Sequence, residues 1–140
     1  MTENFKIIGS FIKDLSSETS DAQTFIFVRD KISKYQLNIE INSKALKNGI
    51  IEVNTNLKFS DQPEILKKSH FEIVYTSIVK INEKISDKKD MEKNILCDAL
   101  NKIYAELERI FLNLLSDSGY PGIKFEKKVD FNKLYEKKSN

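Results

Sequence analysis

Few side chains in this sequence could form a catalytic centre or bind a metal. Among 140 residues there is one histidine, His70, and one cysteine, Cys97. A Ser-His-Asp or Cys-His mechanism would need His70, but no nucleophile-elbow sequence accompanies it, and Cys97 falls on the apolar side of an expected helix. A single cysteine supplies neither an internal disulfide nor the thiolate cluster of a structural zinc site. We therefore expect no enzymatic activity and no bound metal.

Carboxylates and glycines add no catalytic or nucleotide-binding signal. Pairs such as Glu106 with Glu108 lie among lysines, which is the usual pattern of a solvent-facing helix surface. The four glycines form neither of the two common Gly-rich phosphate loops. The sequence therefore predicts no nucleotide and no other cofactor.

The composition is that of a soluble globular domain. Hydrophobic residues make up 40% of the chain and charged residues 31%, with a net charge of +2. No apolar stretch near the N-terminus resembles a signal peptide, and none elsewhere reaches the roughly 18 residues of a membrane span. The sequence thus predicts one domain over residues 1–140, located in the cytoplasm and without membrane contact.

Four segments show the apolar-polar alternation of half-buried β-strands, in which every second side chain points to the same face. They span residues 5–12, 35–41, 51–59 and 71–81. Asn48 and Gly49 lie between the second and third segments and favour a tight turn, which predicts an antiparallel hairpin. In the fourth segment Phe71, Ile73 and Tyr75 share one face.

From about residue 87 the apolar spacing changes to that of an α-helix. Its stripe consists of Leu96, Leu100, Ile103, Leu107, Ile110 and Leu114. Flanking apolar residues widen the arc to roughly 140°, more than one sheet would cover, so a second packing partner is expected. Gly119 and Pro121 end this helix, and Asp130 suits the N-cap of a short helix that reaches Lys138. Together the segments predict an α+β fold: a four-stranded antiparallel sheet with a long helix packed on one face and a short C-terminal helix.

The C-terminal end of the chain is basic. Residues 122–140 hold six lysines against three acidic residues, interleaved with aromatic residues, a pattern found in single-stranded nucleic-acid binding. Lysines also stabilise the C-terminal dipole of a helix, and the aromatic residues fall at positions that pack inward. Binding of RNA or DNA is therefore the less favoured interpretation, and its mark would be a steep salt dependence.

Two stretches of the chain resemble the SecB protein-export chaperones of bacteria. The first is Phe11-Ile-Lys-Asp-Leu-Ser-Ser-Glu-Thr-Ser-Asp-Ala, which is similar to the opening strand of the family and the segment that follows it. The second runs from Gly119-Tyr-Pro-Gly-Ile to Val129-Asp-Phe-Asn-Lys-Leu-Tyr and resembles the ending of the family. With the order of strands and helices, the resemblance covers nearly the whole chain.

The resemblance implies an ATP-independent chaperone that holds unfolded precursor proteins in apolar surface grooves and delivers them to the translocation motor SecA. Candidate client-binding residues are Phe25, Phe27, Phe125, Phe131, Leu134 and Tyr135. The acidic positions that match the SecA-binding surface of the family are Asp14, Glu18 and Glu72, where a small basic, zinc-bearing tail of SecA would dock.

The resemblance also implies assembly as a homotetramer, a dimer of dimers. The expected contacts between subunits are Phe71, Ile73, Tyr75 and Ile110, the first three as an outward-facing set. The wide apolar arc of the long helix is consistent with such a second packing partner.

One further role stays open within the same family. SecB-like chaperones also serve toxin-antitoxin pairs, and the net positive charge of this chain would suit a client other than exported proteins. A toxin gene beside the gene for this protein would distinguish that role from export.

Overall fold

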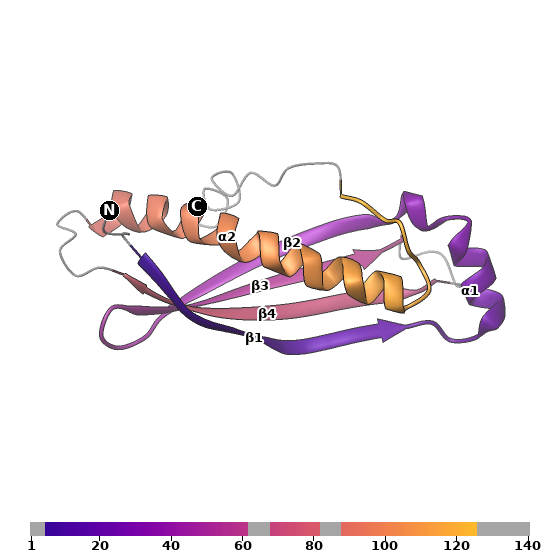
Figure 1. Cartoon of the computed structure of the whole chain (residues 1–140), viewed down its shortest axis with the longest axis horizontal. Coiled ribbons are helices and arrows are strands. Elements are labelled where there is room, and N and C mark those ends of the chain that lie inside the picture. Colours follow the sequence, from indigo (N-terminus) through magenta and orange to yellow (C-terminus); the bar gives the residue numbers. More distant parts are fainter. Residues whose placement is uncertain (1–4, 62–67, 82–87, 126–140) are drawn as a thin grey trace.

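The computed structural model describes residues 5–61, 68–81 and 88–125 of the chain. Its elements are β1 (Phe5–Glu18), α1 (Ala22–Arg29), the 3₁₀ helix η1 (Ile32–Lys34), β2 (Gln36–Ala45), β3 (Ile50–Ser60), β4 (His70–Ile81) and α2 (Lys88–Asp117). The strands form one antiparallel sheet in the order β1-β4-β3-β2, and α2 lies along one face of it (Figure 1). The expected α+β architecture is confirmed, and the expected helix over residues 130–138 lies outside the described residues.

The hairpin of β2 and β3 closes through the turn that the sequence predicts. Asn48 and Gly49 have positive φ angles of 66° and 72°, a conformation that Gly adopts without a Cβ clash and that Asn tolerates better than most residues. Across the turn, the Leu46 N–H donates to the carbonyl of Ile50 at 2.7 Å. The ladder then continues without a register shift to the far end of both strands.

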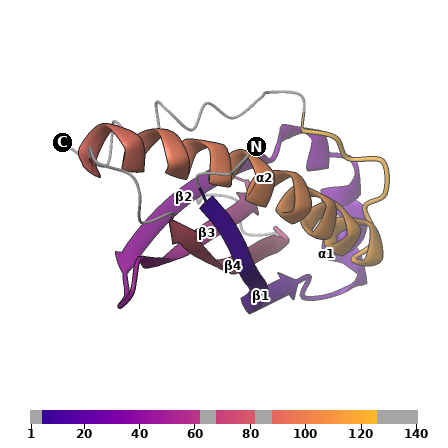
Figure 2. The ribbon, with the colours of Figure 1, turned by 60° about the vertical axis from the view of Figure 1, so that its left-hand side comes forward.

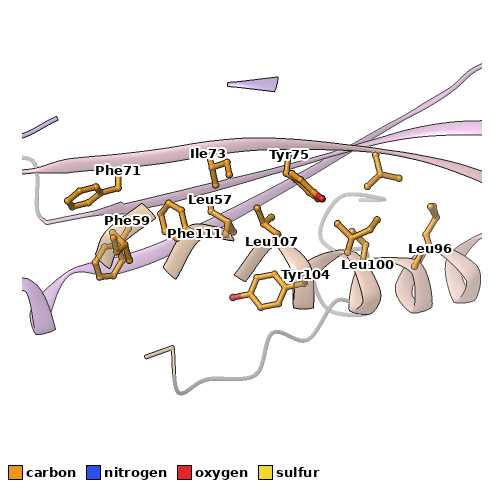
Figure 3. Close-up of a cluster of buried hydrophobic side chains, with 14 of the residues drawn as sticks. Leu57, Phe59, Phe71, Ile73, Tyr75, Leu96, Leu100, Tyr104, Leu107 and Phe111 are labelled. Carbon is orange, nitrogen blue, oxygen red and sulfur yellow. The ribbon is translucent and has the colours of Figure 1, made fainter. Parts of the chain in front are cut away.

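The core lies between the sheet and α2. Leu57, Phe71 and Ile73 on the sheet are fully buried, and so are Leu107 and Phe111 on the helix (Figure 3). Strand alternation puts every second side chain on the covered face, and the helical period puts residues four apart on one stripe. Burial of each such side chain contributes about 1.5–3 kcal/mol. This contact therefore holds α2 on the sheet.

The expectation that Phe71, Ile73 and Tyr75 point outward is wrong. All three are buried, and Figure 3 shows them on the side of β4 that faces α2. The outward assignment followed the family resemblance, whereas large apolar side chains suit the covered face of a sheet. Ile110, the fourth expected subunit contact, is partly buried on α2 at the margin of the core. Its contact with another subunit stays a prediction.

Strand β1 is longer than the segment 5–12 that alternation predicts. Its register against β4 shifts between Ile7 and Gly9 and again between Ile12 and Asp14. Each shift adds a residue and changes which side chains face α2, so the period-two pattern ends although the strand continues. β1 is also an edge of the sheet. Its exposed large apolar side chains are Ile8, Phe11, Ile12 and Leu15.

A short helix that the sequence analysis did not predict follows β1. Asp21 caps α1, because its side chain accepts a hydrogen bond from the Thr24 N–H at 2.7 Å. Val28 of α1 is buried and Ile26 is exposed. With only 8 residues, α1 is too short to show a clear helical period. It lies beside the C-terminal end of α2 (Figure 2).

Candidate functional site

An open groove of about 1000 Å³ lies between β2 and the chain that follows α2. Residues 32, 33 and 35–39, from η1 and the start of β2, form one wall, and residues 121–125 form the other. Phe59 of β3 completes the lining. Aromatic and aliphatic side chains dominate, with a few polar groups between them, a composition typical of sites that bind apolar ligands.

The base of the groove is aromatic and continuous with the core. The Phe59 ring centroid lies 5.4 Å from that of Tyr35 and 5.6 Å from that of Phe125. On its other side, Phe59 meets Phe111 of α2 edge to face, with centroids 6.5 Å apart. The groove therefore takes its shape from the same packing that holds α2 on the sheet.

A buried hydrogen-bond network fixes the Tyr35 wall of the groove. The Tyr35 hydroxyl accepts a hydrogen bond from the Ser69 N–H at 2.9 Å. The Ser69 hydroxyl lies 3.0 Å from that of Tyr120 and 2.6 Å from that of Thr19. Burial raises the pKa of the Tyr35 hydroxyl, so this group stays protonated at neutral pH. Because the network joins segments far apart in the sequence, it makes this wall rigid.

Phe25 and Phe27, two of the expected client contacts, lie on α1 and do not line this groove. The Phe25 ring packs on Tyr120 with centroids 5.3 Å apart and lies against Gly119. Phe27 lies under Lys31, whose Nζ is 4.3 Å from the ring centroid. Both rings are partly buried against the core, and their contact with a client stays a prediction.

Among the remaining expected client contacts, Phe125 lines the groove. The others, which lie outside the described residues, are Phe131, Leu134 and Tyr135. Sequence reasoning missed Leu37 and Ile39 of β2, which also line the groove. Their alternation predicts a half-buried strand, but it does not show that this strand is an edge of the sheet or that it shares a groove with residues 121–125.

The three acidic residues expected to bind SecA share the outer face of the sheet, away from α2. Glu72 lies opposite Ser16 in the register of β1 against β4, and Asp14 and Glu18 lie two residues to either side of Ser16. Because strand side chains alternate, all three carboxylates point to one face. His70 Nε2 lies 3.7 Å from Glu72 Oε1. Their contact with SecA stays a prediction.

The described residues hold no group of three or more His, Cys, Asp and Glu side chains that could bind a metal. Cys97 is buried in the core. Across the same part of the chain, no helix is long and apolar enough to cross a bilayer.

Comparison with protein families matches the whole chain, residues 1–140, to SecB, described as preprotein translocase subunit SecB. The chain is 78% identical over 140 residues to a protein of Pelagibacter ubique (strain HTCC1062) that carries the SecB protein-export name, and the match covers 100% of both proteins. It is 24% identical over 136 residues to the protein-export protein SecB of Rickettsia akari (strain Hartford), covering 96% of this chain and 88% of that protein.

A solved structure has a similar fold. It is the SecB-like chaperone Rv1957 of Mycobacterium tuberculosis in complex with a ChAD peptide from the Rv1956 HigA1 antitoxin, with a TM-score of 0.63 and 11% identity over 90% of this chain and 88% of that one. The four-stranded sheet with a long helix on one face is thus the fold of SecB-like chaperones. The chain belongs to the SecB family of protein-export chaperones.

The contact between Phe25 and Gly119 allows a test of how α1 is held beside α2. Gly119 has a φ angle of 106°, and a Cβ atom there would lie 2.5 Å from Phe25 Cε2. We expect Gly119→Ala to lower the free energy of unfolding by about 2 kcal/mol, because the variant combines backbone strain with a clash. Urea denaturation followed by circular dichroism measures this change.

Gly122→Ala is the matched control, since Gly122 also has a positive φ of 83° but no atom of the described residues lies within 4 Å of its would-be Cβ. It should show the backbone strain alone. Adding Phe25→Leu to Gly119→Ala should restore part of the lost stability relative to Phe25→Leu alone. If Gly119→Ala and Gly122→Ala lower the free energy of unfolding equally, the close contact between Gly119 and Phe25 would be contradicted.

Proposed function

We propose that this protein is an ATP-independent chaperone that binds unfolded precursor proteins in the groove beside β2 and delivers them to SecA. The observation that carries the proposal is an open groove with an aromatic base in a member of the SecB family. An unfolded client presents apolar side chains along an extended backbone, and an open groove accepts such segments without requiring one shape. A folded protein hides the same side chains and is therefore not bound.

The client site is tested by removing apolar side chains from both walls of the groove. Leu37 and Ile123 line opposite walls and are only partly buried, so their replacement should leave the fold intact. We expect Leu37→Ser/Ile123→Ser to weaken binding of an unfolded, fluorescently labelled client about tenfold or more, because each lost apolar contact is worth about 1 kcal/mol or more. Fluorescence anisotropy measures the affinity, and light scattering measures suppression of client aggregation.

Ile26→Ser is the control for this experiment. Ile26 is 56% exposed on α1 and lies outside the groove lining, so its loss removes an exposed apolar side chain without touching the site. Its affinity for the client should equal that of the wild type. If the double variant binds as tightly as the wild type, clients are held elsewhere on the protein.

Transfer to SecA is proposed to use the outer face of the sheet. Asp14, Glu18 and Glu72 share that face and would attract a basic tail. Contacts between exposed charges act over a Debye length of about 8 Å at physiological salt, so binding should be weak and should fall as salt rises.

Titration calorimetry with the basic SecA tail peptide tests this surface. For Asp14→Asn/Glu18→Gln/Glu72→Gln we expect about a tenfold loss of affinity at low salt, since each exposed charge contributes about 0.3–1 kcal/mol. A charge-matched control is Asp30→Asn/Asp98→Asn/Asp117→Asn, which removes three exposed carboxylates at the end of α1 and on α2. Docking of SecA on the outer face of the sheet would be contradicted if the two variants lose affinity equally, or if the wild type releases no heat with the peptide. Either result would favour a dedicated client such as an antitoxin.

Assembly as a homotetramer is proposed to use the β1 edge and α2. Within the described residues, no strand pairs with the outer edge of β1, which also carries exposed apolar side chains, and an open edge of this kind favours pairing with a second copy. Phe11 and Ile12 are adjacent, so they point to opposite faces of the strand and a paired copy would cover both.

Size-exclusion chromatography with light scattering tests the assembly. We expect a tetramer for the wild type and a smaller particle for Ile12→Lys, because a charge at the paired edge would be buried without a partner. Ile110→Glu tests the helix contact in the same way. Leu46→Lys is the control: Leu46 is 42% exposed in the hairpin turn, close to the 44% of Ile12, and its loss should leave the mass unchanged. A monomeric wild type would contradict the assembly.

A further inference from the structure

The outer face of the sheet, away from α2, has its charges sorted by sign along the strands. Odd-numbered residues of β3 and β4, such as Leu57 and Ile73, are buried under α2, so the even-numbered residues point to the outer face. Residues that face each other across a ladder lie on the same side of the sheet, so the partners of these residues in β2 and β1 share that face. The register therefore gives the outer face row by row.

The rows near the start of β4 are acidic. Glu18 of β1 lies opposite His70, and Asp14 lies opposite Val74. The charged residues paired in the rows of His70, Glu72 and Val74, with His70 counted as neutral, are Asp14, Glu18, Glu40 and Glu72 against Lys58. The carboxylates outnumber the one lysine, so this end of the face attracts cations.

The rows near the end of β4 are basic. Lys6 of β1 lies opposite Lys80, and Lys44 of β2 lies opposite Glu52. Lys47 follows in the exposed turn between β2 and β3, which Figure 1 shows at the same end of the sheet as the start of β1. Three paired lysines and the lysine of the turn thus face one glutamate, so this end attracts anions.

An uncharged row separates the two ends. It consists of Phe11, Thr76, Asn54 and Asn42. The Asn54 Nδ2 group donates a hydrogen bond to Glu52 Oε2 at 3.0 Å, and its Oδ1 atom accepts one from the Thr76 hydroxyl at 2.6 Å. From Val74 to Lys80 the strand rises by about 20 Å. This separation exceeds the Debye length of about 8 Å at physiological salt, so the two ends act on a partner independently.

The charges of the basic end are not neutralised within the described part of the chain. Like charges directly opposite in a ladder destabilise a sheet, and Lys6 and Lys80 form such a pair. The ion contact recorded on this face joins His70 Nε2 to Glu72 Oε1 at 3.7 Å and lies at the acidic end. Lys6, Lys44 and Lys80 are exposed. An anionic partner at this end would relieve the repulsion between Lys6 and Lys80.

We propose that the outer face binds a partner segment that carries both signs of charge, with basic residues over the acidic end and acidic residues over the lysine end. This inference rests on the proposed docking of a basic tail and adds a second contact to it. A ligand that is basic throughout would be repelled where it reached Lys6 and Lys80, whereas a segment with both signs is attracted along its whole length.

Labelled peptides with a stiff spacer test the two contacts separately. A run of about six prolines spans about 19 Å, which matches the separation of the two ends. The two-sign peptide joins a Lys-Lys-Lys block to a Glu-Glu-Glu block through this spacer. The basic-only peptide has Ser in place of Glu, and the acidic-only peptide has Ser in place of Lys. At about 0.1 M salt we expect the wild type to bind the two-sign peptide about three- to fivefold more tightly than the basic-only peptide. Fluorescence anisotropy gives the affinities.

A triple variant identifies the second contact. Lys6→Gln/Lys44→Gln/Lys80→Gln should bind the two-sign peptide no more tightly than the basic-only peptide, because the acidic block has lost its partners. The matched control is Arg29→Gln/Lys34→Gln/Lys124→Gln, which also removes three exposed cations but lies outside the four strands. The control should keep the preference for the two-sign peptide. Circular dichroism checks the fold of both variants, and the comparison of peptides on the wild type does not depend on either.

Each result decides one point. Equal binding of the two-sign and basic-only peptides by the wild type would overturn the inference and leave the proposed docking of the SecA tail in place. The inference is also overturned if the acidic-only peptide binds as tightly as the two-sign peptide, or if the lysine variant keeps the preference. Binding of the two-sign peptide without any binding of the basic-only peptide would contradict docking of a purely basic tail and support the inference. If neither binds, both fail.

Discussion

The packing of α2 on one face of the sheet determines what the rest of the molecule can present to a partner. Phe71 and Ile73 meet Leu107 and Phe111 in a layer that is fully buried. The opposite face is partly polar. The Asn54 Nδ2 group donates a hydrogen bond to Glu52 Oε2 at 3.0 Å, and Asn54 Oδ1 accepts one from the Thr76 hydroxyl at 2.6 Å. In the described part of the chain, a helix on one side leaves two strand edges and this outer face for contacts with other molecules.

The groove is an extension of that buried layer. Phe111 of α2 stacks on Phe125 with centroids 6.2 Å apart, and Phe59 contacts both rings. The far wall is held by the hydroxyl network of Tyr35, Ser69 and Tyr120. A groove fixed in this way needs little ordering when a ligand binds, so more of the contact energy appears as affinity. A ligand that is disordered before it binds could therefore still bind, because the groove itself needs little ordering.

The sequence predicts the sheet and α2 well because both have clear periods, and the Asn48-Gly49 turn has the conformation that its residue types favour. It does not predict the second half of β1, since the register shifts interrupt alternation, nor α1, which is held by the Asp21 cap and by packing. For the site, it identifies Phe125 but misses Leu37 and Ile39, because strand order is a property of long-range pairing. The wrong outward assignment of Phe71, Ile73 and Tyr75 has a different cause: alternation defines two faces of a strand without choosing between them, and the choice was taken from the family resemblance.

The two edges of the sheet differ in what they can accept. At β1, Phe11 and Ile12 expose apolar surface on both faces, so a partner must cover both sides of the strand at once. A second folded copy, with its own sheet and helix, can do this. At β2 the partly buried apolar residues Leu37 and Ile39 line the groove, together with the polar, exposed residues Gln36 and Asn38 that alternate with them. A single extended segment needs only apolar side chains along one groove, and β2 contributes Leu37 and Ile39 to such a lining. Assembly through β1 and client binding through β2 would therefore use opposite edges of one sheet and would not compete.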